Sequence, residues 1–300
     1  MGVATDRGRS VARDVSVSAT SVTITYAHEQ FTVRETIFTP LDEPAVMILL
    51  EVDAIRPIEI LAEFTPDIHY AWPAGLGGQY LVWEQNARAF LFSDGRRQVN
   101  AFMGSPAVTQ ASDVPAHMLS AERPRLVLGV GGNADRYTAP RLGEPPGKNV
   151  NIHAAYITIV LAGGVMSRDE ALALYTRLSQ PGAAAAEWRK RQAHARQVVE
   201  GTMRVSTPDR ALNQAFDAAK VNLDESMVCN PDLGCGLVAG YGLSGGASDR
   251  PGFGWFFGGD AFINVLTLNS VGMFEQARDE TWSPLAERVR AAFDPEGVLA

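Results

Sequence analysis

Apolar and polar residues alternate along the first half of the chain, and short clusters of turn-forming residues interrupt the alternation. β-Branched residues in such a pattern are typical of strands, and the unbroken apolar run at 45–52 is typical of a strand buried on both faces. Frequent turns between many short strands favour an antiparallel β-sandwich over a parallel α/β sheet. The pattern predicts strands at residues 15–19, 21–27, 31–39, 45–52, 58–64, 79–84, 87–92, 125–130 and 152–161.

The pattern changes to helical spacing after Gly163 and Gly164. Ser167 followed three positions later by Glu170 is the sequence signature of a capping box at a helix start. A stripe of apolar residues at 212, 216, 219 and 223 predicts a helix that buries one face, and the arginines within 183–200 are interpreted as a solvated face. The helices expected are 170–180, 183–200, one opening at 207–209, 256–270, and 274–293 with Pro284 interrupting it.

These two halves predict an α+β protein of more than one domain. We expect a loose N-terminal tail at residues 1–13, an antiparallel β-sandwich domain at 14–165 and a helical domain at 166–300. The sequence shows no repeat of the solenoid type.

Composition narrows the classes of partner. The formal net charge is −8, which repels nucleic acid and anionic lipid but is compatible with a neutral ligand. The N-terminus lacks the apolar core of a secretory signal, which favours a cytoplasmic location over secretion. The cysteines, Cys229 and Cys235, are too few for a disulfide framework. Two free thiols are the favoured interpretation, a local disulfide is the alternative, and no metal site or cofactor is expected.

The segment from Ala239 to Asp279 is the most informative for chemistry. A glycine-rich loop carries Tyr241, Trp255 and Phe257 and leads to Asp260 at the start of a helix. Aromatic rings suit the apolar faces of a pyranose ring, and a carboxylate accepts hydrogen bonds from sugar hydroxyls. Alternatively, Asp260 is a simple N-cap and the aromatic residues are core packing. The glycines do not have the spacing of a phosphate-binding loop.

The stretch RPGFGWFFGGDAFINVLTLNSVGMFEQARD resembles the hallmark segment of six-hairpin glycosidases, whose helices form an (α/α)6 barrel. The resemblance covers residues 207–279 and is nearest to bacterial glycogen-debranching-enzyme-like proteins, with glucoamylases and trehalases more distant. It implies a β-supersandwich domain followed by a toroid of helices.

The resemblance also implies roles for individual residues. Asp260 would bind hydroxyls of the sugar at the non-reducing end, and Trp255, Phe257 and Tyr241 would line the sugar subsite. Relatives often carry Arg before this Asp, whereas this chain has Gly259; Arg250 could compensate if the loop folds back. The implied reaction is hydrolysis of an α-glucan or related oligosaccharide. Glucoamylase-like relatives invert, with two carboxyl groups about 6.5–9.5 Å apart.

The carboxyl groups that would act as general acid and base are not identified in this sequence. In the family they come from later helices, so we expect them beyond Ala300, with the barrel incomplete here. Acidic residues within the chain, among them Asp224, Glu225, Glu275 and Asp279, are interpreted as solvated. An incomplete barrel would expose Ile263, Leu266, Leu268 and Val271 and favour self-association. The alternatives are a carbohydrate-binding protein without catalysis and an inactive fragment.

Overall fold

The computed structural model describes residues 11–54, 57–64, 79–94, 98–112, 123–130, 154–230, 234–240 and 256–281. The chain divides into two compact units. The first comprises residues 1–69 and 76–192, and the second comprises 70–75 and 193–300.

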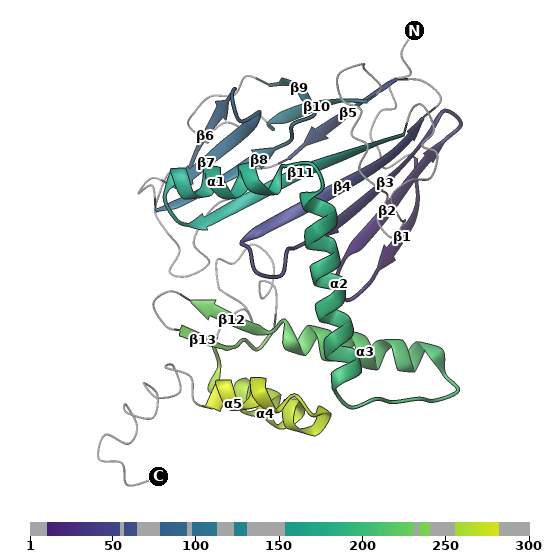
Figure 1. Cartoon of the computed structure of the whole chain (residues 1–300), viewed down its shortest axis with the longest axis vertical. Coiled ribbons are helices and arrows are strands. Elements are labelled where there is room, and N and C mark those ends of the chain that lie inside the picture. Colours follow the sequence, from purple (N-terminus) through teal and green to yellow (C-terminus); the bar gives the residue numbers. More distant parts are fainter. Residues whose placement is uncertain are drawn as a thin grey trace. The chain divides into compact units, whose positions relative to one another are not determined.

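The first unit is built on an eight-stranded antiparallel sheet in the order β1-β2-β3-β4-β11-β8-β7-β6 (Figure 1). The long strand β11 pairs with β4 on one side and β8 on the other, so segments far apart in sequence meet at the centre of the sheet. The strands are β1 (Ala12–Val17), β2 (Val22–His28), β3 (Phe31–Phe38), β4 (Ala45–Ala54), β6 (Gln79–Glu84), β7 (Ala89–Asp94), β8 (Val99–Gly104) and β11 (Ala154–Val165).

A smaller antiparallel sheet packs against one face of the large one. It contains β5 (Ile58–Glu63), β10 (Arg125–Val130) and β9 (Val108–Ala111) in that order. Leu126 and Leu128 of β10 are completely buried in the same core as Leu50 and Phe90 of the large sheet. The two antiparallel sheets share one core, and with the five helices in the described part of the chain the fold is α+β, as predicted.

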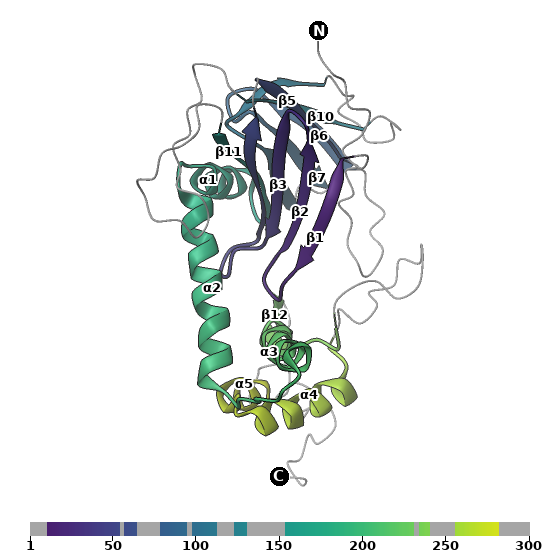
Figure 2. The same ribbon diagram turned by 90° about the vertical axis from the view of Figure 1, so that its right-hand side faces the viewer.

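A helical layer covers the opposite face of the large sheet (Figure 2). Helix α1 (Arg168–Leu178) buries Tyr175 and Leu178 against Phe102 and Met47, and the start of α2 (Ala183–Gly201) joins the same cluster. The predicted capping box is confirmed: the Ser167 hydroxyl accepts from the Glu170 N–H, and the Glu170 carboxylate accepts from the Ser167 N–H. Hydrogen bonds from the Ser167 hydroxyl and backbone hold the pKa of Glu170 below its ordinary value.

Two strands of the sheets, β8 and β9, were not predicted. They are short, and their alternation is weak because Gly104 ends β8 and Pro106 follows it. The reason for Gly104 is steric. A Cβ atom at this position would lie 2.3 Å from the carbonyl oxygen of Arg88. No larger residue therefore fits at the end of β8, where it pairs with the start of β7.

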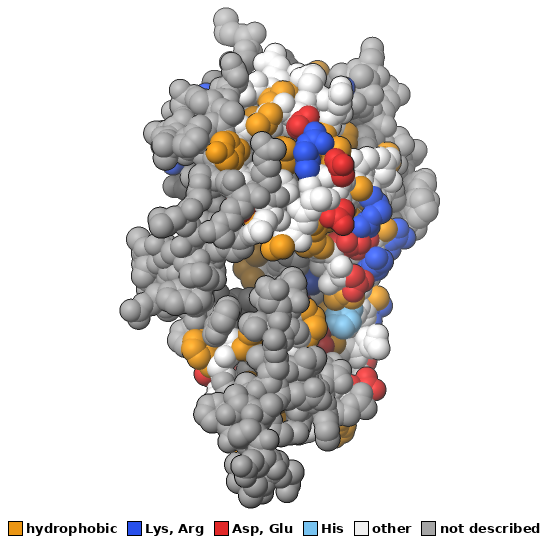
Figure 3. Space-filling model, turned by 90° about the vertical axis from the view of Figure 1, so that its left-hand side faces the viewer, with side chains coloured by type: hydrophobic (Ala, Val, Ile, Leu, Met, Phe, Trp, Pro, Cys, Tyr) orange, Lys and Arg blue, Asp and Glu red, His pale blue; other side chains and the backbone are white. Residues whose placement is uncertain are grey.

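Surface charges of the first unit are interleaved. Arg168 lies 2.8 Å from Glu84, and Arg177 lies 2.6 Å from Glu43. On the face drawn in Figure 3, blue and red side chains alternate along one edge instead of forming a patch of one sign. Exposed pairs of this kind contribute little to stability. Among the described side chains of that face, the charges form no continuous basic track for a phosphate backbone.

The second unit starts within α2 and contains α3 (Arg210–Asp224), β12 (Met227–Asn230), β13 (Gly234–Leu237), α4 (Gly258–Val271) and α5 (Phe274–Thr281). The expected continuation of the last helix to residue 293 lies outside the described residues. None of the described helices is long and apolar enough to cross a membrane.

A disulfide bond joins Cys229 and Cys235, so the interpretation of two free thiols is wrong. The reason is the register of the hairpin: β12 and β13 pair antiparallel with these two residues directly opposite each other. Their Cα atoms are 3.9 Å apart. No hairpin is predicted at these residues from the sequence, so nothing in the local pattern places the two cysteines opposite each other.

The apolar stripe predicted to be buried on α3 lies largely at the surface, with Leu212 53% exposed. Burial on α3 is instead greatest at Lys220 and Val221, which are not members of that stripe. The Lys220 amine donates to the carbonyl oxygens of Val199 and Met203, at 3.0 and 2.8 Å. The buried Lys220 amine, which caps the end of α2, therefore takes the place of the expected apolar contact. A hydrophobic pattern cannot reveal a contact made by a charged side chain.

Candidate functional site

Asp260 lies in the first turn of α4, and its side chain is exposed. The helix begins with Gly258 and Gly259, and Phe257 is the N-cap, with φ −104° and ψ 118° and no hydrogen bond from its side chain. The interpretation of Asp260 as a simple N-cap is therefore wrong. The carboxylate sits at the positive end of the helix dipole, where it is available to accept hydrogen bonds from a ligand.

The Phe257 ring is the second group at this end of α4. It is 41% exposed and stands three positions before Asp260, so the ring and the carboxylate share one end of the helix. The Ala261 N–H donates to the Phe257 carbonyl at 2.9 Å, which fixes the backbone between the two. An exposed aromatic surface beside an exposed carboxylate is the combination that a sugar ring requires.

Three of the five predicted site residues lie outside the described residues: Trp255, Tyr241 and Arg250. Their roles as sugar-subsite and positioning residues stay predictions. Of the five, the structure describes Asp260 and Phe257, which lie three positions apart at the start of α4.

The start of the candidate loop is anchored in the second unit. The Val238 N–H donates to the Ser226 carbonyl oxygen at 2.9 Å. The Val238 carbonyl oxygen accepts from the Asn264 side-chain amide at 3.3 Å. The end of β13 is thus tied to the second turn of α4. Asn264 holds the end of β13 against α4. The sequence does not predict this role, because nothing local marks the contact with Val238.

Asp224 belongs to a network and is not the solvated residue that the sequence predicts. Its Oδ2 lies 2.6 Å from Nε2 of His194, and its Oδ1 accepts from the Gln276 amide at 3.0 Å. Only 10% of the Asp224 side chain is exposed. The network joins α2, α3 and α5, which explains why this carboxylate is committed to structure. Glu275 is exposed, as predicted, and the side chain of Asp279 is outside the described residues.

The prediction that four apolar residues of α4 are exposed is confirmed for two of them and wrong for the other two. Ile263 and Leu266 are 62% and 53% exposed, whereas Leu268 and Val271 are buried. The burial of the second pair follows from the turn at the end of α4. Gly272 adopts a left-handed conformation with φ 84° and turns the chain back, so α5 covers the end of α4 that carries Leu268 and Val271.

Asp260 offers two acceptor oxygens, and Phe257 offers an apolar face. No group of His, Cys, Asp and Glu suited to a metal ion occurs among the described residues.

Comparison with known proteins gives a coarse likeness of fold. No family model and no curated protein matches the sequence. A heparan sulfate lyase HepC mutant from Pedobacter heparinus matches with a TM-score of 0.30 and 8% identity, over 52% of this chain and 22% of the lyase. A bacterial glucoamylase complexed with acarbose matches with a TM-score of 0.42 and 11% identity, over 89% of this chain and 40% of the glucoamylase.

Both of these proteins are carbohydrate-active enzymes by name, and the chain spans well under half the length of either. At such scores the likeness is limited to a general arrangement of sheet and helices. The assignment of a family therefore still depends on the residues themselves.

Proposed function

We propose that this chain takes part in the hydrolysis of an α-glucan or a related oligosaccharide and that the N-terminal end of α4 holds a sugar residue. In this proposal Asp260 accepts hydrogen bonds from hydroxyls at the non-reducing end, and the Phe257 ring packs against the apolar face of the sugar. Trp255 and Tyr241 extend the aromatic wall, and Arg250 supplies the cation that relatives carry before the Asp.

One observation carries the proposal: Asp260 and Phe257 are both exposed at one helix end, within a segment whose order of residues resembles that of six-hairpin glycosidases. A residue kept for packing would be buried, and a capping carboxylate would occupy the position of Phe257. Exposure of both groups supports a ligand-facing role.

The proposed division of labour follows from the chemistry of glycoside hydrolysis. An inverting mechanism needs a protonated carboxyl group at the leaving oxygen and a carboxylate that activates water on the opposite face of the sugar. Asp260 binds and orients the substrate and does neither. The acid and the base are proposed to come from helices beyond Ala300.

The test uses the chain of 300 residues and measures two quantities. Maltotetraose is titrated by calorimetry, and release of glucose from the same sugar is followed over hours. We expect binding that Asp260→Asn weakens at least tenfold, because a neutral amide donates where a carboxylate accepts. Phe257→Ala should weaken binding by a similar factor. If this chain lacks the acid and the base, hydrolysis should stay at the level of the uncatalysed reaction.

Matched controls come from the neighbouring helix. Glu275 is an exposed acid in the first turn of α5, and Phe274 is an exposed aromatic residue 64% accessible. Glu275→Gln and Phe274→Ala should leave binding unchanged. Equal losses in the controls, or no binding by the natural chain, would remove the sugar site from α4. Binding without hydrolysis in a longer chain that includes the later helices would favour the non-catalytic alternative.

A further inference from the structure

The disulfide bond between Cys229 and Cys235 is a reactive group that the proposed sugar site does not use. Both residues are exposed on the hairpin of β12 and β13, so a dissolved thiol can reach the sulfur atoms. They are the two cysteines of the chain, so no third cysteine exchanges with them. Exposed disulfides are typically the labile and regulatory ones, whereas structural ones resist reduction.

Backbone pairing also holds the two cysteines together, because Cys229 lies directly opposite Cys235 in the ladder between β12 and β13. The ladder pairs four residues of each strand, and a two-stranded hairpin is only marginally stable by itself in water. The disulfide therefore keeps the hairpin closed. After reduction the ladder still brings the two sulfur atoms together, so the bond is able to form again.

The hairpin is linked directly to the helix of the proposed sugar site. Three residues after Cys235, the Val238 carbonyl oxygen accepts from the Asn264 side-chain amide at 3.3 Å. Asn264 lies one turn after Asp260 on α4. β13 also contacts α4 and α5, and its last residue, Leu237, is buried. Opening of the hairpin therefore removes a restraint from the helix that carries Asp260.

We propose that this disulfide is a redox switch of the second unit: reduction opens the hairpin, and the open hairpin loses its hold on α4. In the oxidised chain the bond keeps β12 and β13 paired, and Val238 stays within reach of Asn264. In the reduced chain the hairpin opens more often, and the start of α4 is less restrained. The effect on sugar affinity rests on the proposed function, whereas the opening of the hairpin does not.

The chemistry is exchange with a dithiol reductant. A thiolate of the reductant attacks one of the two cysteine sulfur atoms and breaks the disulfide bond, and the other cysteine leaves as a thiolate that takes a proton from water. The second thiolate of the reductant attacks the reductant sulfur in the mixed disulfide and releases the first cysteine. In sum, two electrons and two protons pass to the protein, and the reductant becomes a cyclic disulfide.

Hydrogen exchange of the chain of 300 residues, with and without dithiothreitol, tests the opening. Mass spectrometry after treatment with iodoacetamide establishes the redox state, since only the reduced cysteines are alkylated. After reduction we expect exchange about tenfold faster in the hairpin and about threefold faster in α4, through local opening. A bond that is reduced only in denaturant, or equal exchange in both forms, would overturn the proposal.

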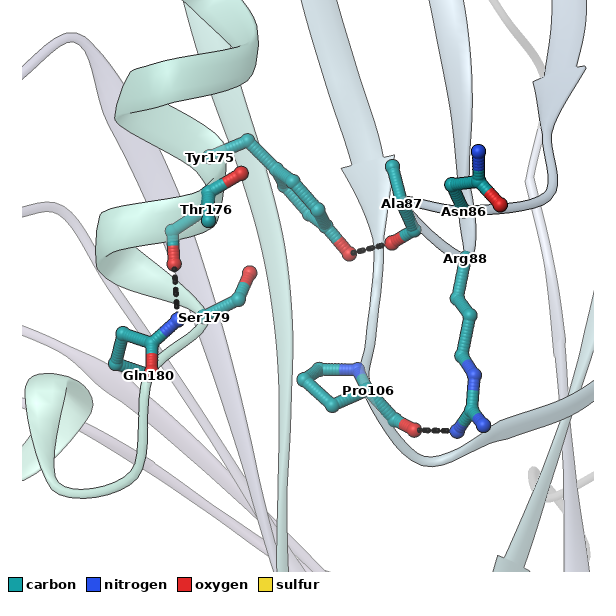
Figure 4. A pocket seen from close by; sticks show the side chains of 8 residues that line it. All are labelled: Asn86, Ala87, Arg88, Pro106, Tyr175, Thr176, Ser179 and Gln180. Atoms are coloured by element: carbon teal, nitrogen blue, oxygen red, sulfur yellow. Dashed lines mark hydrogen bonds between the residues drawn. The ribbon is translucent and has the colours of Figure 1, made fainter.

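Helix α1 is the internal control for this measurement. It belongs to the first unit, which contains no cysteine. The Tyr175 hydroxyl donates to the Ala87 carbonyl at 3.2 Å and ties the helix to the turn between β6 and β7 (Figure 4). Exchange in α1 should be the same in both redox states. An equal rise in α1 would mean that the reductant loosens the whole chain, which contradicts a switch within the second unit.

Variants separate the bond from its coupling to α4. The double variant Cys229→Ser with Cys235→Ser should exchange like the reduced chain and show no response to dithiothreitol. Asn264→Ala removes the bond to Val238, so its hairpin should still respond to reduction whereas its α4 should not. Thr267→Ala is the matched control, because this exposed hydroxyl donates to Ile263 within α4. A response of α4 that survives Asn264→Ala would overturn the coupling.

Titration with maltotetraose shows whether the switch reaches the sugar site. We expect the oxidised chain to bind about fivefold more tightly than the reduced chain, because opening lowers the fraction of chains competent to bind. Equal affinity in both forms would overturn the effect on the sugar site. Absence of binding in both forms would contradict the proposed function alone, since the exchange measurement needs no sugar.

Discussion

The amine of Lys220 lies 2.8 Å from the carbonyl oxygen of Met203, so a fully buried cation ties α3 to the residues that follow α2. The same amine donates to the Val199 carbonyl at 3.0 Å and lies 3.4 Å from Asp217. Two backbone acceptors are thus satisfied by one side chain. This contact and the network at Asp224 are both polar links within the described part of the second unit.

Replacing Lys220 by Met should therefore destabilise the second unit strongly. Met has a similar length, so the loss reflects two carbonyl groups left buried without donors, at about 3 kcal/mol. Urea unfolding followed by circular dichroism measures the change. Arg204→Met is the control, because Arg204 is an exposed cation of the same unit. Equal stability of the two variants would show that the buried amine is not needed.

Adjacent glycines at the end of β11 should respond very differently to the same substitution. Gly163 has φ 149°, and a Cβ there would lie 2.1 Å from the Asn100 carbonyl oxygen, whereas a Cβ at Gly164 would meet nothing closer than 3.9 Å. Gly163→Ala should cost about 3 kcal/mol or more through strain and overpacking. Gly164→Ala should stay within about 1 kcal/mol of the natural chain. Thermal unfolding of the two variants side by side is the measurement, and similar melting temperatures would contradict the close packing of β8 against β11.

Stability should fall at alkaline pH because of Tyr175. Burial raises its folded-state pKa to about 12 from the ordinary value of 10.0. The stabilisation is complete below pH 10 and is lost as the pH rises through the folded-state pKa, since the unfolded chain ionises first. At pH 11 the loss from this residue is about 1.4 kcal/mol.

Urea unfolding at pH 8 and pH 11 checks this value, with Tyr175→Phe as the comparison. The variant should be less stable at pH 8, because it lacks the bond to Ala87, but should lose less between the two pH values. Part of the slope should persist in the variant, because burial and Glu35 also raise the pKa of Tyr26. Identical slopes would exclude Tyr175 as the titrating group.

The outer face of α4 should drive self-association. Phe262, Ile263 and Leu266 are 65%, 62% and 53% exposed on neighbouring turns, and open apolar patches of this kind favour contact between copies. Sedimentation at tens of micromolar should give a species heavier than the 32.3 kDa monomer. Leu266→Glu should restore the monomer. Val17→Glu, at an exposed apolar site in the first unit, should not. A monomeric natural chain would speak against this surface.

Much of the fold follows from local patterns in the sequence. Alternating residues located most strands of the large sheet, and Ser167 with Glu170 located the start of α1, because capping depends on residues close in sequence. The pairing of β11 with both β4 and β8 did not follow, since a continuous apolar run names no partner. The burial of Lys220 and the opposition of Cys229 and Cys235 likewise depend on contacts made after folding.

The candidate sites divide in the same way. Asp260 and Phe257 were found because their segment is distinctive in order and composition. The contact between Asn264 and Val238 does not follow from the sequence, because the two residues come from separate segments and no short motif unites them.

The bond between Cys229 and Cys235 makes the second unit sensitive to the compartment in which the chain folds. Both cysteines are exposed, and such bonds persist in oxidising compartments but are rare in the cytosol. Expression in the reducing interior of a laboratory host would leave the two cysteines as free thiols, whereas export or refolding in air-oxidised buffer would form the disulfide.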